Sequence, residues 1–234
     1  MMKTVEETRN QAAIALSPRV KEELEQFLTP MPVALQAASL FTLSKNPVKI
    51  LDLGAGTGIL SALVMKNSPT ESSILAIEKD HHLAKICEKS LNNVSSHVTV
   101  LNDSLENIQF TEHFERVILN PPYKKITPIN VPTQYGPVKV TNLYTYFLVR
   151  AADALTDRGE CVAIIPRSWM NGDYFKDFRS WLTMHYSIDT LAIYNSRTDH
   201  FKDMNVLQEI MLIKITKANQ KPKIVVYPRL PQCG

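Results

Sequence analysis

The sequence predicts an α/β fold in which an open, mostly parallel sheet of seven strands carries helices on both faces. Short apolar runs alternate with helical patterns, as where Val48–Leu53 is followed by Ile59–Lys66. A glycine-rich turn, Gly54–Gly58, joins these two elements without a gap, which is typical of a nucleotide-binding βαβ unit. Four successive predicted strands also end beside a carboxyl or amide side chain, which indicates a ligand site at one edge of the sheet.

The composition is that of one globular domain in a reducing compartment. The 234 residues are 44% apolar and 21% charged, and the net charge of +3 permits an anionic partner without requiring one. Cys87, Cys161 and Cys233 lack the spacing of a metal site or a disulfide framework, and we expect the first two to be buried thiols. No segment resembles a signal peptide or a membrane span, so we expect a cytoplasmic protein with no membrane partner.

The chain divides into three predicted regions: a helical lead-in at 1–46, the main α/β domain at 47–216 and a polar tail at 217–234. Prolines around Thr29-Pro30 break the lead-in into separate helices. The free N–H groups at the start of its last helix would hold an anion such as a carboxylate, although an ordinary helical lead-in explains the pattern too. The predicted lead-in helices are Thr4–Leu16, Ser17–Leu28 and Val33–Leu43.

Hydrophobic periodicity places the remaining elements. The seven predicted strands are Val48–Leu53, Ser73–Glu78, Val98–Leu101, Phe114–Leu119, Cys161–Ile165, Ile188–Tyr194 and Leu207–Ile215. The predicted helices of the main domain are Ile59–Lys66, Asp80–Asn92, Leu143–Leu155 and Tyr174–Met184. The proline-rich segment Tyr123–Lys139 shows no period, and we interpret it as an irregular loop that covers the substrate.

The glycine-rich turn favours S-adenosylmethionine over a dinucleotide. Gly54, Gly56 and Gly58 follow a G-x-G-x-G spacing, whereas dinucleotide sites use G-x-G-x-x-G. Glycines there let a ligand approach the backbone closely. Asp52 just before the turn would repel phosphates and attract the amino or sulfonium end of S-adenosylmethionine.

Two further acids extend this cofactor site along the sheet edge. Glu78 lies 20 residues after Gly58 (78 − 58), an offset at which a carboxylate accepts hydrogen bonds from both ribose hydroxyls. Asp103 follows the third strand, where it would accept from the exocyclic amino group of the cofactor's adenine.

The fourth strand ends in Asn120-Pro121-Pro122-Tyr123. The prolines cannot continue a parallel strand, so the Asn120 carboxamide should point beyond the sheet edge. The Asn120 side chain and the Pro121 carbonyl are two neutral acceptors that can converge on one amino group, while Tyr123 lays its ring on a flat substrate. This arrangement suits methylation of a conjugated –NH2, although Asn-Pro-Pro alone also fits a stiff turn.

Taken together, the motifs resemble those of the gamma-ordered, adenine-specific DNA methyltransferases of restriction-modification systems, over roughly Phe27 to Ile215. The resemblance rests on Thr29-Pro30, Asp52–Gly58, Glu78, Asp103-Ser104 and Asn120–Tyr123, in that order. It implies a Rossmann-like methyltransferase fold and transfer from S-adenosylmethionine to the N6 amino group of adenine in DNA. It also implies cofactor contacts from Thr29, Pro30 and Ser104, and a base-stacking role for Phe201.

The resemblance implies a mechanism on a flipped base. An adenine inside a duplex cannot react, so it would be rotated out of the double-stranded DNA into the pocket and stacked on Tyr123. Asn120 and the Pro121 carbonyl would then bind its amino group, with Pro122 lining the substrate. No metal or general base is required. Lys124, Lys125 and Lys139 are candidate phosphate contacts, and solvated loop lysines are an equally good explanation.

Two other functions fit the same residues. A second family with the same tetrapeptide methylates a protein glutamine, of the release-factor type, and a glutamine –NH2 is also a conjugated amine. A non-catalytic cofactor-binding subunit is the other alternative, but a scaffold needs neither Asn120 nor Tyr123. The tail after the last predicted strand is too short for a domain. We therefore expect DNA recognition to come from a separate subunit or from a missing C-terminal domain that begins in 217–234.

Overall fold

The computed structural model describes residues 29–193, 210–217 and 226–227, which form one twisted sheet covered on both faces. The strand order is β10-β8-β9-β7-β4-β1-β2-β3, and β9 alone among these runs antiparallel to its neighbours, β7 and β8. The strands are β1 (Lys49–Leu53), β2 (Ser73–Ile77), β3 (Val98–Leu101), β4 (Phe114–Leu119), β7 (Leu155–Pro166), β8 (Ser187–Ile193), β9 (Ile210–Thr216) and β10 (Val226–Tyr227).

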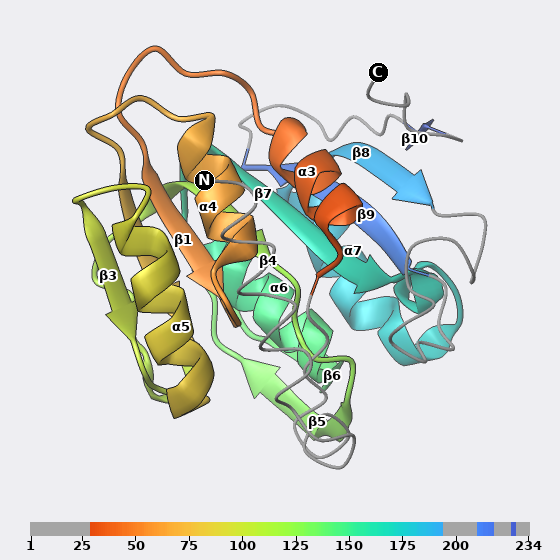
Figure 1. Ribbon diagram of the computed structural model, residues 1–234. Coiled ribbons are helices and arrows are strands. Elements are labelled where there is room, and N and C mark those ends of the chain that lie inside the picture. Colours follow the sequence, from red (N-terminus) through yellow and green to blue (C-terminus); the bar gives the residue numbers. More distant parts are fainter. Residues whose placement is uncertain (1–28, 194–209, 218–225, 228–234) are drawn as a thin grey trace.

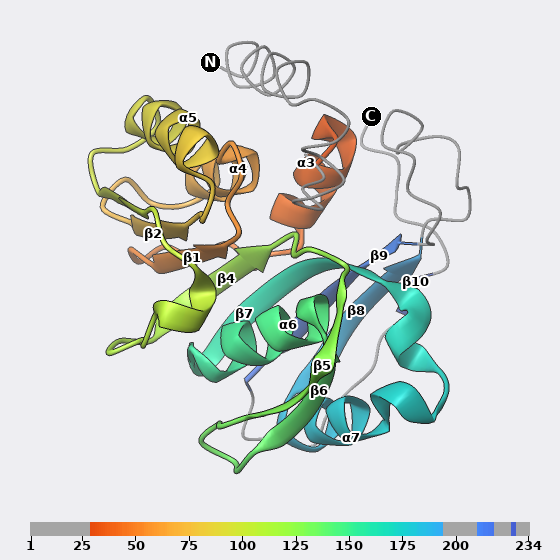
Figure 2. The same cartoon turned by 90° about the horizontal axis from the view of Figure 1, so that it is seen from below.

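Helices cover both faces of this sheet, as predicted (Figure 2). One face carries α3 (Met31–Ser39), α4 (Ile59–Lys66) and α5 (His81–Asn92), and the other carries α6 (Leu143–Asp153) and α7 (Lys176–His185). Three short 3-10 turns complete the connections: η1 (Leu105–Asn107), η2 (Arg167–Met170) and η3 (Asp173–Phe175).

The central strands are apolar throughout because both of their faces are buried. In β1, Ile50 packs into the cluster under α3 and α4, whereas Leu51 packs into the cluster around α6. In β4, Ile118 and Leu119 divide between the two clusters in the same way. Cys87 and Cys161 are buried free thiols, as predicted.

All seven predicted strands are present, and the two-residue β10 adds an eighth at the edge. The prediction of only a polar tail after Ile215 is therefore wrong at β10, which is too short to give a periodic signal. β7 begins at Leu155 instead of Cys161. The turn-like residues around Arg158, whose φ is 62°, interrupt the apolar pattern but not the strand.

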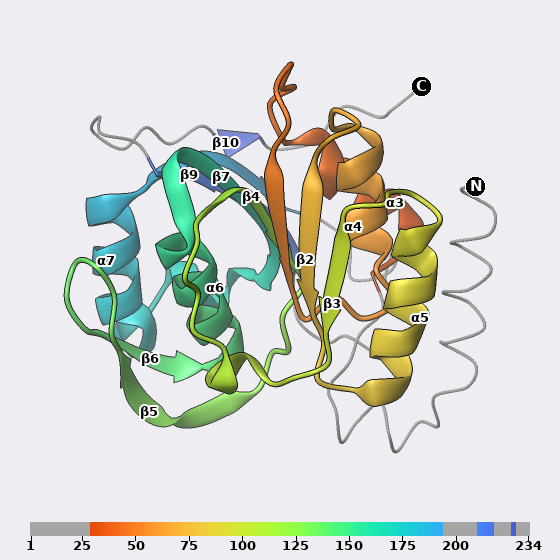
Figure 3. The same cartoon turned by 90° about the vertical axis from the view of Figure 1, so that its left-hand side faces the viewer.

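The prediction of an irregular loop at Tyr123–Lys139 is wrong. The segment contains an antiparallel hairpin of β5 (Lys125–Val131) and β6 (Val138–Asn142), and Val131 and Val138 are buried in the core. Prolines in and beside β5 hid it, but a two-stranded ribbon at the molecular surface tolerates prolines that a central strand does not. The hairpin lies beside α6, below the sheet edge where β1 and β3 end (Figures 1 and 3).

The third lead-in helix differs from its prediction at both ends, because α3 begins at Met31 and ends at Ser39. Beyond Ser39, strand side chains take over the backbone polar groups. Glu160 accepts hydrogen bonds from the Thr42 N–H (2.9 Å) and Oγ1 (2.6 Å), and Arg116 donates to the Thr42 carbonyl (2.6 Å). Lys214 forms an ion pair with Glu160 at 2.7 Å and donates to the carbonyl of Leu40 at 2.8 Å. This polar cluster fixes the lead-in to the sheet.

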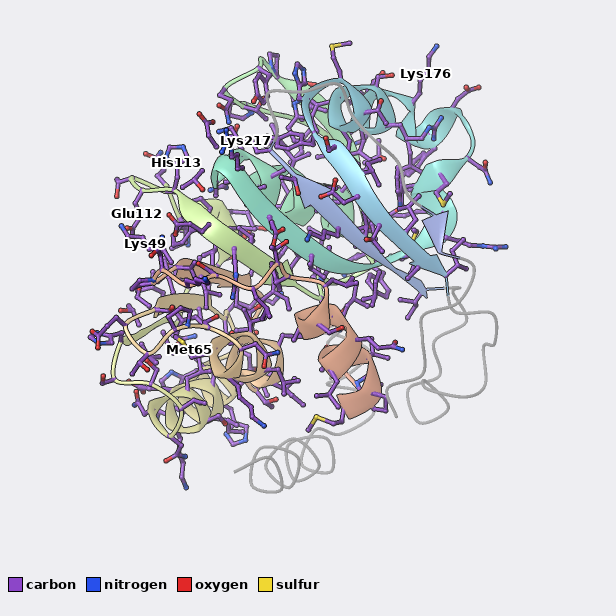
Figure 4. The ribbon with its side chains drawn as sticks, turned by 90° about the horizontal axis from the view of Figure 1, so that it is seen from above. Lys49, Met65, Glu112, His113, Lys176 and Lys217 are labelled. Carbon is purple, nitrogen blue, oxygen red and sulfur yellow. The ribbon has the colours of Figure 1, made fainter. Side chains whose placement is uncertain are left out.

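The opposite, amino-terminal edge carries ordinary surface chemistry. There, the exposed side chains of Lys49 and Glu112 form an ion pair at 2.6 Å (Figure 4). Within the described part of the chain, no helix has both the length and the hydropathy needed to cross a membrane.

Candidate active site

The glycine-rich turn is held rigidly against β2. The N–H groups of Gly54 and Ala55 both donate to the Ile77 carbonyl, at 2.9 and 3.0 Å. Gly54, Gly56 and Gly58 have φ values of 73°, 57° and 79°, a region that favours glycine. The turn therefore requires these glycines for its shape, before any ligand binds.

Asp52 lies one residue before the end of β1 and is fully buried, so it sits deeper than the sequence suggested. The hydroxyl of Ser61 in α4 donates to its Oδ2, whereas Oδ1 has no hydrogen-bond partner among the described residues. Burial raises the pKa of Asp52 to about 7. In the turn itself, the buried Thr57 Oγ1 is also without a partner among those residues. Unsatisfied buried oxygens are costly, so both are candidates for ligand contact.

Glu78 follows β2 directly and is 4% exposed. Its carboxylate accepts from the N–H of Gly56 at 2.8 Å and from the N–H of Asp80 at 2.9 Å. Burial raises its pKa in spite of these two hydrogen bonds. The acid predicted to bind a ribose thus also links the second strand to the glycine-rich turn.

Asp103 and Ser104 lie just beyond β3 at the same edge. Asp103 Oδ1 accepts from Asn107 Nδ2 at 2.8 Å and from the Ser104 N–H at 2.7 Å, and these bonds lower the pKa of Asp103. The Ser104 hydroxyl donates to Glu106. Asn102 braces this corner from one residue earlier by donating to the Glu78 carbonyl at 3.0 Å.

Asn120 follows the last residue of β4 and is partly exposed. Its Nδ2 donates to the hydroxyl of Thr29 at 2.9 Å, and its Oδ1 accepts from the hydroxyl of Tyr123 at 3.0 Å. The Tyr123 hydroxyl also lies 3.3 Å from the Ile164 carbonyl in β7. The carboxamide is thus held from both ends by groups that are far apart in sequence.

The Tyr123 ring is half-buried and meets Tyr144 of α6 edge to face, with 6.3 Å between ring centroids. Pro121 is buried and Pro122 is partly exposed. Burial raises the pKa of the Tyr123 hydroxyl, which therefore stays protonated as a donor to Asn120.

Lys124 and Lys125 are exposed at the base of the hairpin, and the Lys124 carbonyl accepts from the Leu143 N–H at 2.8 Å. Lys125 Nζ lies 5.9 Å from the ring centroid of Tyr174, so the hairpin contacts η3. Lys139 is exposed in β6. Phe201 lies outside the described residues, as do the predicted helices Thr4–Leu16 and Ser17–Leu28.

The sheet brings most of the predicted polar residues to one edge. Leu53 pairs with both Ile77 and Leu119, so Gly54, Glu78 and Asn120 leave three neighbouring strands at the same level. Sequence reasoning missed Thr57 and the contact between Thr29 and Asn120. Thr57 carried a signal, since it is the polar residue inside the glycine-rich turn, whereas a contact across 91 residues leaves no local pattern.

This fold and site define a class I methyltransferase. The positive-φ turn, the unsatisfied Asp52 oxygen and the Glu78 carboxylate fit the cationic and ribose parts of S-adenosylmethionine, the predicted cofactor and the cofactor of this fold. Residues 28–201 match the family model "Eco57I restriction-modification methylase". The chain belongs to that family, which confirms the resemblance to restriction-modification methylases.

Comparison with known proteins gives the same class. The Type II methyltransferase M.BsuBI of Bacillus subtilis is 30% identical over 96% of this chain and 50% of its own length. A tRNA1(Val) (adenine(37)-N6)-methyltransferase of Shewanella baltica (strain OS195) is 32% identical over 59% of each chain. The crystal structure of a putative class I S-adenosylmethionine-dependent methyltransferase from Listeria monocytogenes superposes with a TM-score of 0.71 at 14% identity, covering 95% of this chain and 72% of that one. The chain spans about half the length of M.BsuBI.

Proposed function

We propose that this chain is the catalytic core of a DNA methyltransferase that modifies the N6 amino group of adenine within a restriction-modification system. The observation that carries the proposal is the Asn120 carboxamide at the end of β4. It stands on the strand next to the glycine-rich turn, and Thr29 and Tyr123 hold it by its two ends. A neutral acceptor in that place suits an amino group whose lone pair is conjugated with a ring.

The chemistry assigned to these residues is positioning and electrostatic stabilisation. S-adenosylmethionine, when bound, supplies an electrophilic methyl group. Asn120 Oδ1 and the Pro121 carbonyl accept the two amino hydrogens, which draws the nitrogen toward a tetrahedral geometry and frees its lone pair for in-line attack. These acceptors also stabilise the positive charge that develops on nitrogen before a proton leaves to water.

The cofactor roles follow the order of the strands. We assign the cationic end of S-adenosylmethionine to Asp52, its ribose to Glu78 and its adenine to Asp103, with Ser104 beside it. Gly54, Gly56 and Gly58 would allow close approach to the backbone. The lead-in residues Thr29 and Pro30 would complete the site.

The substrate roles lie on the hairpin side of the edge. A flipped adenine would stack on the Tyr123 ring, with Pro122 beside it and Phe201 as a second aromatic. The exposed Lys124, Lys125 and Lys139 would contact phosphates.

RNA is a second candidate substrate, because a relative matched over 59% of this chain is named for adenine N6 methylation in tRNA. A protein glutamine amide is the chemical alternative, since it also offers a conjugated amine. A non-catalytic cofactor-binding subunit would need no acceptor residues at all.

For the whole protein, we propose the division made from the sequence: a lead-in at 1–46, a catalytic domain at 47–216, and DNA recognition supplied by a separate subunit or further domain. Double-stranded DNA in the cytoplasm would be the setting of the reaction.

Transfer of a labelled methyl group to DNA, RNA and protein in parallel tests the proposal. We expect label in DNA, and nuclease digestion should place it in N6-methyladenine. Label that appears in protein or RNA and not in DNA would overturn the proposed substrate. Cofactor binding without transfer to any acceptor would support the non-catalytic subunit.

A further inference from the structure

We propose that Thr29 is a positioning residue for Asn120, in addition to any contact it makes with the cofactor. Its hydroxyl oxygen accepts a hydrogen bond from Asn120 Nδ2 at 2.9 Å. This contact determines which end of the carboxamide faces the amino group of the substrate. The inference rests on the proposed function and adds a residue of the lead-in to the acceptor apparatus at the end of β4.

The orientation of the carboxamide decides whether Asn120 can act. An asparagine side chain presents an acceptor at Oδ1 and two donors at Nδ2, and rotation by 180° exchanges them. Only Oδ1 can accept from a substrate –NH2, because Nδ2 would oppose one donor with another. Thr29 binds Nδ2 and Tyr123 donates to Oδ1, so both contacts support the orientation that the chemistry requires.

The contact also strengthens the acceptor. A carboxamide that donates through its nitrogen becomes more polarised, and its oxygen becomes a better acceptor. Thr29 is only 4% exposed, so little water competes for the Asn120 N–H. This matters most when positive charge develops on the substrate nitrogen.

Backbone rigidity holds Thr29 in place. Pro30 is extended (φ −61°, ψ 144°) and caps α3, and its carbonyl accepts from the Ala34 N–H at 3.0 Å. Pro32 lies in the first turn of the helix. Since proline fixes φ, the chain leaving Thr29 has little freedom to move its hydroxyl away.

Packing fixes α3 relative to Asn120. Val33 and Ala37 of α3 are fully buried in the same cluster as Ile118 of β4 and Ile164 of β7. Ile118 lies two residues before Asn120, and the Ile164 carbonyl lies beside the Tyr123 hydroxyl. After α3, the polar cluster of Glu160, Lys214 and Arg116 ties the chain to the sheet. The distance between Thr29 and Asn120 is therefore a property of the core.

The kinetic test compares Thr29→Val, which keeps the shape but loses the hydroxyl, with Thr29→Ser, which keeps the hydroxyl. We expect Thr29→Val to lower kcat for DNA methylation by about 100-fold, the cost of a misplaced catalytic group. The calorimetric Kd for S-adenosylmethionine should stay unchanged. Thr29→Ser should recover most of kcat, and Thr183→Val, at an exposed threonine of α7, is the matched control. A weakened Kd with unchanged kcat would overturn the proposal and assign Thr29 to the cofactor alone.

A readout that needs no activity uses the side-chain amide resonances of Asn120, identified by their loss in Asn120→Ala. In wild type and Thr29→Ser, the proton bonded to Thr29 should be protected from exchange with solvent. In Thr29→Val that protection should be lost, while in Thr183→Val it should remain. Unchanged Asn120 resonances in Thr29→Val would overturn the proposal. If wild type transferred methyl to no amino acceptor, the proposed function would fail, yet these spectra would still decide whether Thr29 holds Asn120.

Discussion

The acids of the site differ in how far the protein itself already satisfies them. Glu78 accepts from two backbone N–H groups, and Asp103 is bonded to Asn107 and to its own loop. Asp52 has one oxygen bonded to Ser61 and one without a partner among the described residues. A ligand therefore adds to existing bonds at Glu78 and Asp103, but satisfies an exposed deficit at Asp52.

Glu78→Gln should weaken S-adenosylmethionine binding by ~1.5–3 kcal/mol, because a neutral amide cannot accept two ribose hydroxyls as a carboxylate does. One amide oxygen remains for the Gly56 N–H, so the turn should stay folded. Calorimetry measures the affinity, with Glu88→Gln at an exposed site of α5 as the control. Equal affinity in a folded Glu78→Gln would remove Glu78 from the cofactor site.

Asp52 should make stability depend on pH in a definite direction. Its folded pKa of about 7 lies above its ordinary value of 3.8, so between these pH values the folded state binds a proton that the unfolded state has lost. The free energy of unfolding should then fall by roughly 2–4 kcal/mol from this group as pH rises from 4 to 7. Urea unfolding across this range checks it. Asp52→Asn should abolish that slope, and the same slope in the variant would contradict the assignment.

At the scale of elements, the strands and the glycine-rich turn were predictable, whereas the hairpin and the role of Thr29 were not. Ile50-Leu51 and Ile118-Leu119 are buried on both faces, and such continuous apolar runs mark central parallel strands. The β5–β6 ribbon is stabilised by packing against α6 and α7 instead of by its own alternation, so its prolines suggested a loop. The Thr29–Asn120 contact depends on how α3 packs, which no local pattern encodes.

The hairpin base should bind nucleic acid through charge. Lys124→Ala combined with Lys125→Ala should weaken duplex affinity and reduce the slope of log K against log salt by about 2, one for each phosphate that the variant no longer neutralises. Fluorescence anisotropy at several salt concentrations measures both effects. Lys49→Ala, at the opposite edge of the sheet, is the matched control (Figure 4). An unchanged slope in the double variant would make these lysines solvated surface residues.

At the scale of the whole molecule, the fold places every proposed site residue that the structure describes on one side. The carboxyl ends of β1–β4, the start of α3 and the hairpin base converge there, while the other edge carries surface ion pairs (Figures 1 and 4). The two core clusters hold this geometry from both faces of the sheet. The site is thus a consequence of strand order and of the anchored lead-in.

This chain by itself should select its DNA sequence poorly. Reading several base pairs requires side chains placed deep in a groove, and the described residues offer only the β5–β6 hairpin and the η2–η3 connection on the substrate side. Methylation of a random-sequence duplex library, followed by sequencing of the modified positions, measures the selectivity. A sharp motif of four or more base pairs would contradict this expectation and would assign readout to the chain itself.

Substitution of Asn120 tests the central claim most directly. Asn120→Ala should retain its melting temperature and its Kd for S-adenosylmethionine, yet lose methyl transfer to duplex DNA by ~100-fold or more, because one preorganised acceptor is gone. The measurement is single-turnover transfer of labelled methyl, with digestion to locate N6-methyladenine. Loss of transfer with intact cofactor binding is the result we expect. Near-normal transfer by a folded Asn120→Ala would contradict the account, and the Asn-Pro-Pro segment would then be a turn.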